Sequence, residues 1–552
     1  MKTLLIGINS KFIHPNMAIR YLKANCDFPV AIKEYTIKDN KDEIINDILL
    51  ESPEIIGFSC YIWNISYILE IVETLRKLKP ECIVIFGGPE VSYEYNNYLI
   101  NNIADYIIIN EGEISFNLLI KSLSELRPLN DIPNLSYLKD GLIVRNKSSV
   151  IGDLNSLKSP YYFDFDERDI SKKVQYVELS RGCPYQCSYC LASLERGLRF
   201  FNIENVFTII DHLVQKGAKT IKFLDRSFNA NKKLALNFFK TLIEKDYSNT
   251  VFQFEINGDV LDKKIVDYLV DNLKKDYVRF ELGVQSTNDL VNLSINRFQN
   301  TNVLIDNIRN LQKSNVILHL DLIAGLPHED LNSFKKTFNE IFILFAEELQ
   351  LGFLKMLKGT KIRKEAKLHD YVFSQEPPYE ISQNMYISTD ELEIIHEVEV
   401  FLEIYWNKGF MQKTIKHIMV HQSNPFDFFL NLSLFYKENN LSHKKYQLYD
   451  LFINLRSYLE YINILDAETD DLLKLDYLLY NKIKPKVYWE NEFKKQDIIR
   501  EFQQINQEYN LDSLYKYSLV TKYKDGYLFV MYFPDKKEVI YWNVITKRIS
   551  SL

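Results

Sequence analysis

Three cysteines within eight residues carry the clearest chemical signal in the sequence. Cys183, Cys187 and Cys190 lie in the segment RGCPYQCSYCLAS (181–193), with a C-x3-C-x2-C spacing. Cysteine thiolates are the natural ligands of iron–sulfur clusters. A [4Fe-4S] cluster offers four irons, so three thiolates leave one iron open to a substrate or cofactor. The spacing therefore predicts a cluster with one exchangeable iron.

Zinc is the alternative metal for this segment. A structural zinc site has four ligands, usually supplied by two pairs of cysteines or histidines. Here no second cysteine pair follows the triplet, and the nearest downstream histidine, His212, falls within a predicted helix. Six cysteines in 552 residues are also too few for a disulfide scaffold. We therefore expect iron and sulfide rather than zinc.

Composition limits the class of protein. A length of 552 residues suggests about three to four domains, and 46% apolar with 26% charged residues is typical of a globular chain. The net charge of −7 gives no overall basic field, so a nucleic-acid partner is not expected. No apolar run reaches the length of a membrane span, and the N-terminal apolar stretch is too short for a secretory signal. We expect a cytoplasmic protein that does not bind membranes.

The first 127 residues alternate short apolar runs with amphipathic stretches. This alternation is typical of parallel strands covered by helices on both faces, and it predicts a five-stranded Rossmann-like α/β domain. The expected strands are 3–8, 29–37, 55–60, 82–88 and 105–110, and the expected helices are 16–26, 41–51, 64–79 and 113–126. In such a domain ligands lie beyond the carboxyl ends of the strands.

The rest of the chain divides into three parts. Residues 128–173 hold several prolines and predict a linker with one hairpin around Asp140–Gly141. Residues 174–360 predict a partial (β/α)6 barrel, with strands at 174–180, 219–225, 250–256, 277–283, 316–325 and 348–357. Residues 361–552 predict a mainly helical domain of unknown role that ends in a β meander at 523–542.

The cysteine segment, taken together with this barrel, resembles the radical S-adenosylmethionine superfamily. The resemblance rests on the C-x3-C-x2-C spacing, on Tyr189 directly before the last cysteine, and on the position after the first barrel strand. It implies that the open iron binds the amino and carboxylate groups of S-adenosylmethionine. One electron from the cluster would then cleave this cofactor to methionine and a 5′-deoxyadenosyl radical.

The same resemblance implies further contacts with S-adenosylmethionine at the ends of later strands. Asp225 ends the second strand, where the family's common Gly-Gly-Glu turn is absent. Glu281 and Gln285 lie in ELGVQS, the region that meets the ribose, and Arg297 lies where relatives place an arginine near the methionine carboxylate. Gly325 lies in LIAGLPHE, which shapes the adenine pocket. Each of these residues could instead be an ordinary strand-end or turn residue.

The N-terminal domain resembles the cobalamin-binding domain found beside one group of radical barrels. The residues that carry this resemblance follow the third, fourth and fifth strands; they are Ser59, Gly87, Gly88, Pro89, Glu111 and Gly112. Ser59 would bond the nucleotide tail, and Gly87 and Gly88 lack the β-carbon that would keep a large planar ligand away from the backbone. The alternative is ordinary turn chemistry at strand ends.

The first loop departs from the cobalamin pattern. Many such domains carry Asp-x-His-x-x-Gly there, and its histidine is the lower cobalt ligand. Asn9 and Lys11 stand in place of the Asp and His, and His14 comes three residues late. We therefore expect base-off cobalamin without a histidine lower ligand.

The resemblance implies a radical methyltransferase that acts on an unactivated carbon or phosphorus centre. The substrate would be a small molecule or peptide, methylcobalamin would give the methyl group, and flavodoxin or ferredoxin would supply electrons. Cobalamin-dependent radical cyclisation or rearrangement is the alternative, followed by tRNA modification and by a non-catalytic cobalamin sensor. The aromatic C-terminal residues would either cap the barrel or build a separate core.

Overall fold

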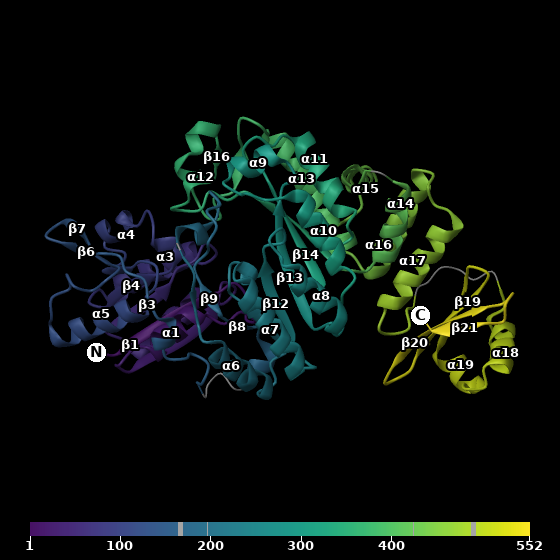
Figure 1. The fold of residues 1–552 in the computed structure, drawn as a ribbon, viewed down its shortest axis with the longest axis horizontal. Helices are drawn as coiled ribbons and strands as arrows, with labels where there is room; N and C mark the ends of the chain where they lie inside the picture. The colour runs from purple at the N-terminus through teal and green to yellow at the C-terminus, as the bar shows by residue number, and fades with distance from the viewer. Residues whose placement is uncertain (164–168, 196, 423, 487–492, 552) are drawn as a thin grey trace. The chain divides into compact units, whose positions relative to one another are not determined.

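The computed structural model describes residues 1–163, 169–195, 197–422, 424–486 and 493–551 (Figure 1). The chain forms two compact units. One comprises residues 1–334 and 351–392, and the other comprises residues 335–350 and 393–552. In the described part of the chain, none of the helices combines the length and the apolar character needed to cross a membrane.

The N-terminal sheet has seven strands in the order β2-β1-β3-β4-β5-β6-β7. The strands are β1 (Thr3–Asn9), β2 (Val30–Thr36), β3 (Ile55–Ser59), β4 (Ile83–Gly87), β5 (Tyr106–Ile108), β6 (Leu135–Lys139) and β7 (Leu142–Arg145). The first five are parallel, which confirms the predicted doubly wound core. The hairpin at Asp140–Gly141 also forms. It pairs antiparallel with β5 and so covers an edge that would otherwise be open.

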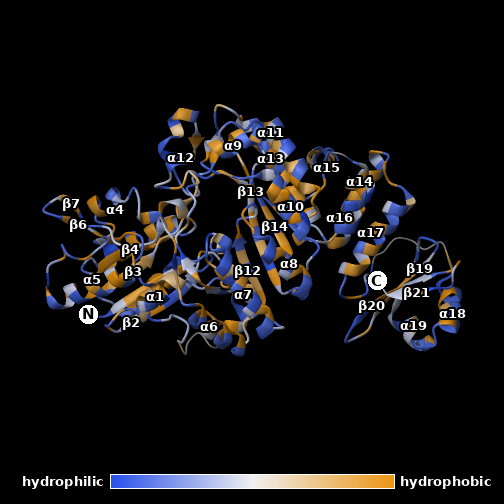
Figure 2. Ribbon diagram, in the orientation of Figure 1, coloured by the Kyte–Doolittle hydropathy of each residue, from blue (hydrophilic) through white to orange (hydrophobic). Residues whose placement is uncertain are grey.

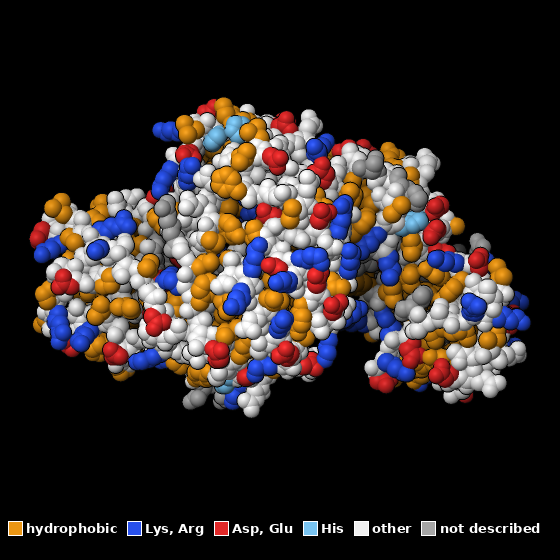
Figure 3. All heavy atoms as spheres, in the orientation of Figure 1, with side chains coloured by type: hydrophobic (Ala, Val, Ile, Leu, Met, Phe, Trp, Pro, Cys, Tyr) orange, Lys and Arg blue, Asp and Glu red, His pale blue; other side chains and the backbone are white. Residues whose placement is uncertain are grey.

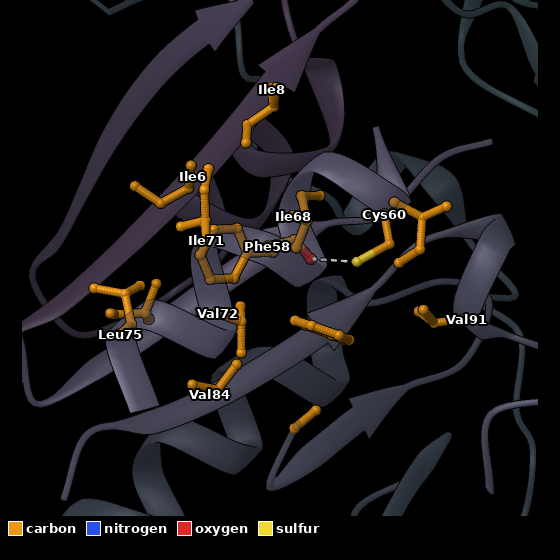
Figure 4. Packing of buried hydrophobic residues seen from close by; sticks show 14 of the residues in the cluster. Ile6, Ile8, Phe58, Cys60, Ile68, Ile71, Val72, Leu75, Val84 and Val91 are labelled. Carbon is orange, nitrogen blue, oxygen red and sulfur yellow. Dashed lines mark hydrogen bonds between the residues drawn. The ribbon is translucent and has the colours of Figure 1, made fainter. Parts of the chain in front are cut away.

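Helices cover both faces of this sheet. They are α1 (Met17–Ala24), α2 (Lys41–Glu51), α3 (Ile65–Leu78), α4 (Asn96–Ile100) and α5 (Glu113–Glu125). One apolar core joins the sheet to α2, α3 and α4, and a second joins it to α1 and α5. Figure 4 shows the first core, in which Ile68, Ile71 and Val72 of α3 pack near Phe58 of β3. The two cores explain why the central strands β1, β3 and β4 are largely apolar.

The second sheet of the first unit has the order β15-β14-β13-β12-β11-β8. Its strands are β8 (Gln175–Val177), β11 (Thr220–Phe223), β12 (Val251–Ile256), β13 (Val278–Gln285), β14 (Ile317–Ala324) and β15 (Glu348–Phe353). The helices between them are α6 (Ile203–Gln215), α7 (Lys232–Lys245), α8 (Lys263–Asn272), α9 (Asp289–Ser294), α10 (Thr301–Leu311) and α11 (Leu331–Phe342). Neighbours in space are neighbours in the chain, and β8 and β15 are both edges, as expected for a partial barrel.

The strands of this partial barrel alternate between two environments. In β12, Phe252, Phe254 and Ile256 are buried, whereas Gln253 and Glu255 are only partly buried. Figure 2 shows the same mixture of apolar and polar residues along β12 to β14. The phenylalanines pack against the helices, so the intervening polar residues lie on the inner face of the barrel.

Short elements surround the barrel strands. The two-stranded ribbon of β9 (Ser180–Arg181) and β10 (Arg199–Phe200) follows β8, with a 3-10 turn at Leu191–Leu194. After β15 come α12 (Lys361–Lys364), a 3-10 turn at Ala366–His369, β16 (Val372–Phe373) and β17 (Ile381–Gln383).

The second unit is mainly helical, as predicted. Its helices are α13 (Thr389–Leu402), which begins in the first unit, α14 (Gln412–His421), α15 (Pro425–Glu438), α16 (Leu448–Tyr461), α17 (Ala467–Tyr480), α18 (Lys495–Ile505) and α19 (Leu511–Tyr517). The predicted meander forms from β18 (Ser518–Tyr523), β19 (Gly526–Tyr532), β20 (Lys537–Asn543) and β21 (Ile549–Ser551). Stacked Phe502 and Phe529 belong to an apolar core between α18, α19 and this sheet, so aromatic residues here build a core of their own.

Candidate functional site

The three cysteines lie on the loop between β9 and β10. The ribbon holds both ends of this loop, because Ser180 pairs with Phe200 and Arg181 with Arg199. Gly182 has a φ of +92°, and a Cβ there would stand 1.9 Å from the carbonyl oxygen of Gly197. Only glycine fits this position without a backbone shift. Gly182 thus allows the sharp turn by which the chain enters the cysteine loop.

Burial shapes the chemistry of the thiols. It raises the pKa of Cys183 and of Cys190, and the neighbouring thiols add to this effect, while the charge of Arg226 opposes it. Cys187 is 9% exposed. Within the described residues no three His, Cys, Asp or Glu side chains are gathered as ligands of a single metal ion. Each thiolate of a [4Fe-4S] cluster binds its own iron, so the donor set fits that group, and loading would release protons.

Arg297 lies against the cysteine loop. Its Nη2 donates to the carbonyl oxygen of Gly283, and its Nε donates to Gln299 Oε1 at 2.9 Å. Burial lowers the pKa of the Arg297 guanidinium. The interactions with Tyr189 and Cys187 outweigh this effect, so the pKa is raised overall. The structure therefore brings three predicted site residues, Tyr189, Cys187 and Arg297, together.

Gln285 ends β13 in a conformation that is unusual for a side chain of its size. Its φ is +66°, and a register shift precedes it between Gly283 and Gln285. A Cβ at Gly283 would stand 2.3 Å from Gln285 Nε2, so the glycine makes room for the amide. Gln285 Oε1 is buried and has no hydrogen-bond partner in the described part of the chain. A strained residue with a free acceptor at a strand end fits a polar ligand such as S-adenosylmethionine.

Charged residues line the inner face of the barrel. Glu281 of β13 forms an ion pair with Lys222 of β11 at 2.8 Å. Glu255 lies 3.9 Å from Arg226, and His319 Nε2 lies 3.0 Å from Asp321 Oδ1.

Sequence reasoning missed Lys222, Glu255 and Asp321 in this set. Burial raises the pKa of Glu255 and of Asp321. The alternation of apolar and polar residues in TIKF, VFQFEI and ILHLDL could have identified them, because it places these side chains on the inner face of the barrel.

Asp225 is engaged by the chain rather than open to a ligand. It is buried after β11, where Oδ2 accepts from the backbone N–H of Leu179 at 2.9 Å and Oδ1 accepts from the hydroxyl of Ser180 at 2.5 Å. Both partners lie directly before the cysteine loop. These two hydrogen bonds therefore hold the start of that loop against Asp225.

Replacing Asp225 by asparagine should make folding less sensitive to pH. Burial raises the pKa of Asp225 to about 7 from the ordinary 3.8. Between these values the folded chain holds a proton that the unfolded chain has lost, so stability falls as pH rises through this window. At about 1.4 kcal/mol per pH unit, the wild type should lose roughly 2–3 kcal/mol more than the variant between pH 5 and pH 7.

Urea unfolding at the two pH values measures this difference. Asp140→Asn, in the exposed hairpin turn, is the matched control, and its stability should depend on pH in the same way as that of the wild type. Equal pH dependence in Asp225→Asn and wild type would show that Asp225 is ionised throughout.

The carboxyl ends of β3 and β4 place four predicted cobalamin residues side by side. Ser59 Oγ accepts from Asn16 Nδ2 at 2.6 Å, and Pro89 opens a short 3-10 turn. Gly88 has a φ of +110°, and a Cβ there would stand 2.5 Å from the carbonyl oxygen of Cys60. At Gly87 the nearest atom to such a Cβ is 3.7 Å away. The close approach of the Cys60 backbone therefore explains why residue 88 is glycine, whereas a Cβ at Gly87 would make only an ordinary contact with the chain.

The remaining cysteines lie apart from the loop. Cys60 follows β3 and Cys82 precedes β4, so they lie at opposite ends of neighbouring parallel strands. Cys60 is fully buried beside Phe58, and burial raises the pKa of its thiol well above the ordinary value (Figure 4). Cys26 is partly buried. His14 lies in the first loop, with its Nδ1 2.7 Å from the hydroxyl of Tyr176.

Glu111 takes part in a buried ion network. It binds Arg199 at 2.8 Å and Arg181 at 3.3 Å, and Arg181 also binds Glu113 at 2.7 Å and Glu178 at 3.0 Å. All five side chains are at most 15% exposed. The network joins the end of β5 to both strands of the ribbon that holds the cysteine loop. Glu111 therefore binds other side chains of the protein in this structure, and its contact with cobalamin stays a prediction.

Two predicted glycines are also explained by packing. Gly112 precedes α5, and a Cβ there would lie 3.2 Å from Leu22. Gly325 has a φ of +84°, and a Cβ would stand 2.1 Å from Ile381. The carbonyl oxygen of Gly325 accepts from the hydroxyl of Tyr371 at 2.8 Å and from Asn384 Nδ2 at 3.0 Å. The segment after β15 thus covers the turn that follows β14.

Known families match three parts of the chain. A B12 binding domain model matches residues 3–120, a Radical SAM superfamily model matches residues 177–341, and a family of unknown function, DUF4080, matches residues 367–526. The last match covers most of the C-terminal domain, residues 361–552, whose role we could not predict from sequence.

Individual curated proteins are similar to parts of the chain. TokK, a cobalamin-dependent radical SAM methyltransferase of Streptomyces tokunonensis, is 24% identical over 58% of this chain and 49% of its own length. An anaerobic magnesium-protoporphyrin IX monomethyl ester cyclase of a Synechocystis strain is 24% identical over 50% of this chain and 56% of its own length. The chain thus matches about half the length of these curated relatives.

A solved structure shares the fold over more of the chain. OxsB, a cobalamin-dependent S-adenosylmethionine radical enzyme solved with aqua-cobalamin and S-adenosylmethionine, aligns with a TM-score of 0.60 at 14% identity. The alignment covers 92% of this chain and 81% of OxsB.

Proposed function

The chain combines a B12-binding domain with a radical SAM domain, and from this premise we propose that it is a cobalamin-dependent radical enzyme that transfers methyl groups. Its acceptor would be an unactivated carbon or phosphorus centre in a small molecule or peptide. The observation that carries the proposal is the three-cysteine loop, which the ribbon places directly after the first barrel strand and the ion network ties to the N-terminal domain.

Each cofactor has a set of residues that would hold it. Cys183, Cys187 and Cys190 would bind the [4Fe-4S] cluster. Tyr189, Gln285 and Arg297 would contact S-adenosylmethionine, and Ser59, Gly87 and Pro89 would border base-off cobalamin. When bound, the cluster supplies the electron that cleaves S-adenosylmethionine, and cobalamin supplies the methyl group.

The chain's own residues prepare the site for this chemistry. Arg297 places a fixed positive charge beside Cys187, where thiolates bear negative charge once a cluster is bound. Asp225 and Gly182 hold the start of the loop in place. Paired charges on the inner face of the barrel, such as Lys222 with Glu281, favour a polar substrate over an apolar one.

Radical cyclisation or rearrangement is the second candidate. The similarity to the magnesium-protoporphyrin IX monomethyl ester cyclase supports this candidate, because that relative is 24% identical to this chain over 56% of its own length. Both candidates need the same cofactors, so the fate of the methyl group separates them.

Anaerobic reconstitution with iron, sulfide and hydroxocobalamin tests the proposal. Metal analysis should give a filled [4Fe-4S] site and one cobalt for each chain. S-adenosylmethionine labelled in its methyl group should then label cobalamin and, in a screen of polar small molecules and peptides, the acceptor. Iron without cobalt would remove the methylcobalamin mechanism, and a product that never carries the label would favour cyclisation or rearrangement.

Replacing Gly87 by alanine should weaken cobalamin binding selectively. The added Cβ meets nothing closer than 3.7 Å within the described chain, so folding and iron content should be unchanged. A ligand packed on the backbone would lose contact, which corresponds to about a tenfold higher Kd at 1.4 kcal/mol. Cobalamin titration followed by visible absorbance measures this change.

Gly152→Ala is the matched control, because a Cβ there has no neighbour within 4 Å and the residue lies in the segment after the hairpin. Gly88→Ala is not a suitable probe, since its Cβ would collide with Cys60 and disturb the turn. Unchanged cobalamin affinity in Gly87→Ala would place the corrin elsewhere.

A further inference from the structure

A group of exposed lysines follows the last barrel strand. Lys361 and Lys364 lie on α12, and Lys367 lies in the turn that follows it. All three are exposed, and Lys361 lies 3.8 Å from Glu365. Figure 3 shows Lys and Arg side chains beside apolar ones where Figure 1 labels α12. On a chain with a net charge of −7, this local basic surface is not a consequence of composition.

This basic surface is attached to the cysteine loop. The backbone N–H of Ile362 in α12 donates to the carbonyl oxygen of Ser188 at 3.0 Å. Ser188 lies between Cys187 and Tyr189, and its own N–H donates to the carbonyl oxygen of Ile295 at 2.8 Å. Ser188 is therefore bonded on both sides, to α12 and to the end of α9.

Exposed apolar residues lie on the α9 side of Ser188. Phe298 is 82% exposed and follows Arg297, the residue that interacts with Cys187. Leu290 and Leu293 are 57% and 55% exposed and lie three residues apart, so they share one face of α9. Exposed aromatic and apolar side chains are typical of binding sites for other proteins, and here they flank the same Ser188 as the lysines of α12.

We propose that this surface, formed by Lys361, Lys364, Lys367, Leu290, Leu293 and Phe298, binds a small acidic flavoprotein that reduces the cluster. The inference rests on the proposed function, because it needs a cluster held by the cysteine loop. The lysines complement an acidic partner, and Phe298 with the leucines complements the apolar edge of a flavin ring. The reduced flavin would give up one electron and the cluster would gain it, with no bond made or broken.

Charge reversal tests the proposal on the full chain. The variant is Lys361→Glu/Lys364→Glu/Lys367→Glu, and flavodoxin with its reductase is the probe. The KM for flavodoxin in S-adenosylmethionine cleavage should rise about tenfold or more, and the difference should shrink at high salt. Flavodoxin affinity, measured by calorimetry with unreduced proteins, should fall in parallel. Cleavage driven by dithionite should be unchanged, because this small reductant needs no docking surface.

The matched control is Lys219→Glu/Lys275→Glu/Lys313→Glu. These exposed lysines precede β11, β13 and β14, at the other end of the barrel strands, and the change in charge is identical. Phe298→Ser is a second variant, which should weaken flavodoxin binding without altering net charge.

Two results would overturn the assignment. One is an unchanged KM and affinity for flavodoxin in both surface variants, and the other is an equal fall in flavodoxin affinity in the lysine control. Failure of the proposed function looks different, because the wild-type chain would then not cleave S-adenosylmethionine even with dithionite.

Discussion

Replacing Cys187 by alanine should yield a folded chain that no longer retains an iron–sulfur cluster. Cys187 is the middle cysteine of the triplet, is buried, and interacts with Arg297, and we propose that its thiolate binds the cluster. Losing an outer-shell partner of a metal ligand already costs 10–100-fold in affinity or activity. Losing the ligand itself should reduce S-adenosylmethionine cleavage by more than about 100-fold.

The measurement combines iron and sulfide analysis with the visible spectrum and the yield of 5′-deoxyadenosine. Cys82→Ala is the matched control. Its thiol is also buried, but it lies before β4 with the carbonyl oxygens of Pro53 and Glu54 each 3.5 Å from Sγ. This control should keep its iron. Full cleavage by Cys187→Ala, or zinc in place of iron in the wild type, would contradict the cluster assignment.

Replacing Arg181 by methionine should destabilise the first unit by about 3–5 kcal/mol, the usual cost of breaking a buried ion pair from one side. Methionine keeps much of the length of the side chain but removes the charge. Glu113 and Glu178 would then lose their ion pairs with Arg181, and Glu111 would keep only Arg199. Because Arg181 directly precedes Gly182 and the cysteine loop, cluster retention should fall as well.

Urea unfolding, with iron content measured in parallel, checks this prediction. The free energy of unfolding of Arg181→Lys should lie between those of the wild type and of Arg181→Met. Lysine restores the positive charge but not the hydrogen bonds that Nε, Nη1 and Nη2 of Arg181 make together. Charges of Arg199 and Arg181 lower the pKa of Glu111 against the effect of burial. The stabilisation is therefore present above the ordinary pKa of a carboxyl and is lost as pH falls. A methionine variant as stable as wild type at pH 7 would show that the network contributes nothing.

Much of the architecture was predictable because it depends on local patterns. Continuous apolar runs identified all five parallel strands of the first sheet, and βα alternation identified the six strands of the second. The hairpin was predicted from Asp140–Gly141, but not its pairing with β5, because no local pattern specifies which edge a hairpin joins. Missed elements such as α4 are short and carry little periodicity.

The predictions for the candidate site that come from spacing need only local sequence, and they stay predictions. The cysteine triplet, Tyr189 and the turn at Gly87 depend on a few consecutive residues. Glu111 was expected to meet a ligand, yet it binds Arg199, which is 88 positions away in the chain. Gly88 was expected to leave room for a ligand, but the space left by its missing Cβ is taken by the backbone of Cys60. Such contacts depend on the tertiary fold, so a single sequence does not reveal them.

The ion network also bears on the order in which the chain folds during synthesis. Glu111 and Glu113 leave the ribosome before Arg181 and Arg199, and at typical elongation rates the delay is on the order of ten seconds. During that time both carboxylates must stay hydrated, because burying them without their partners is costly. The nascent α/β domain therefore completes the end of β5 only when the ribbon of the cysteine loop arrives. Completion of the end of β5 and of the cysteine loop is in this sense a single event.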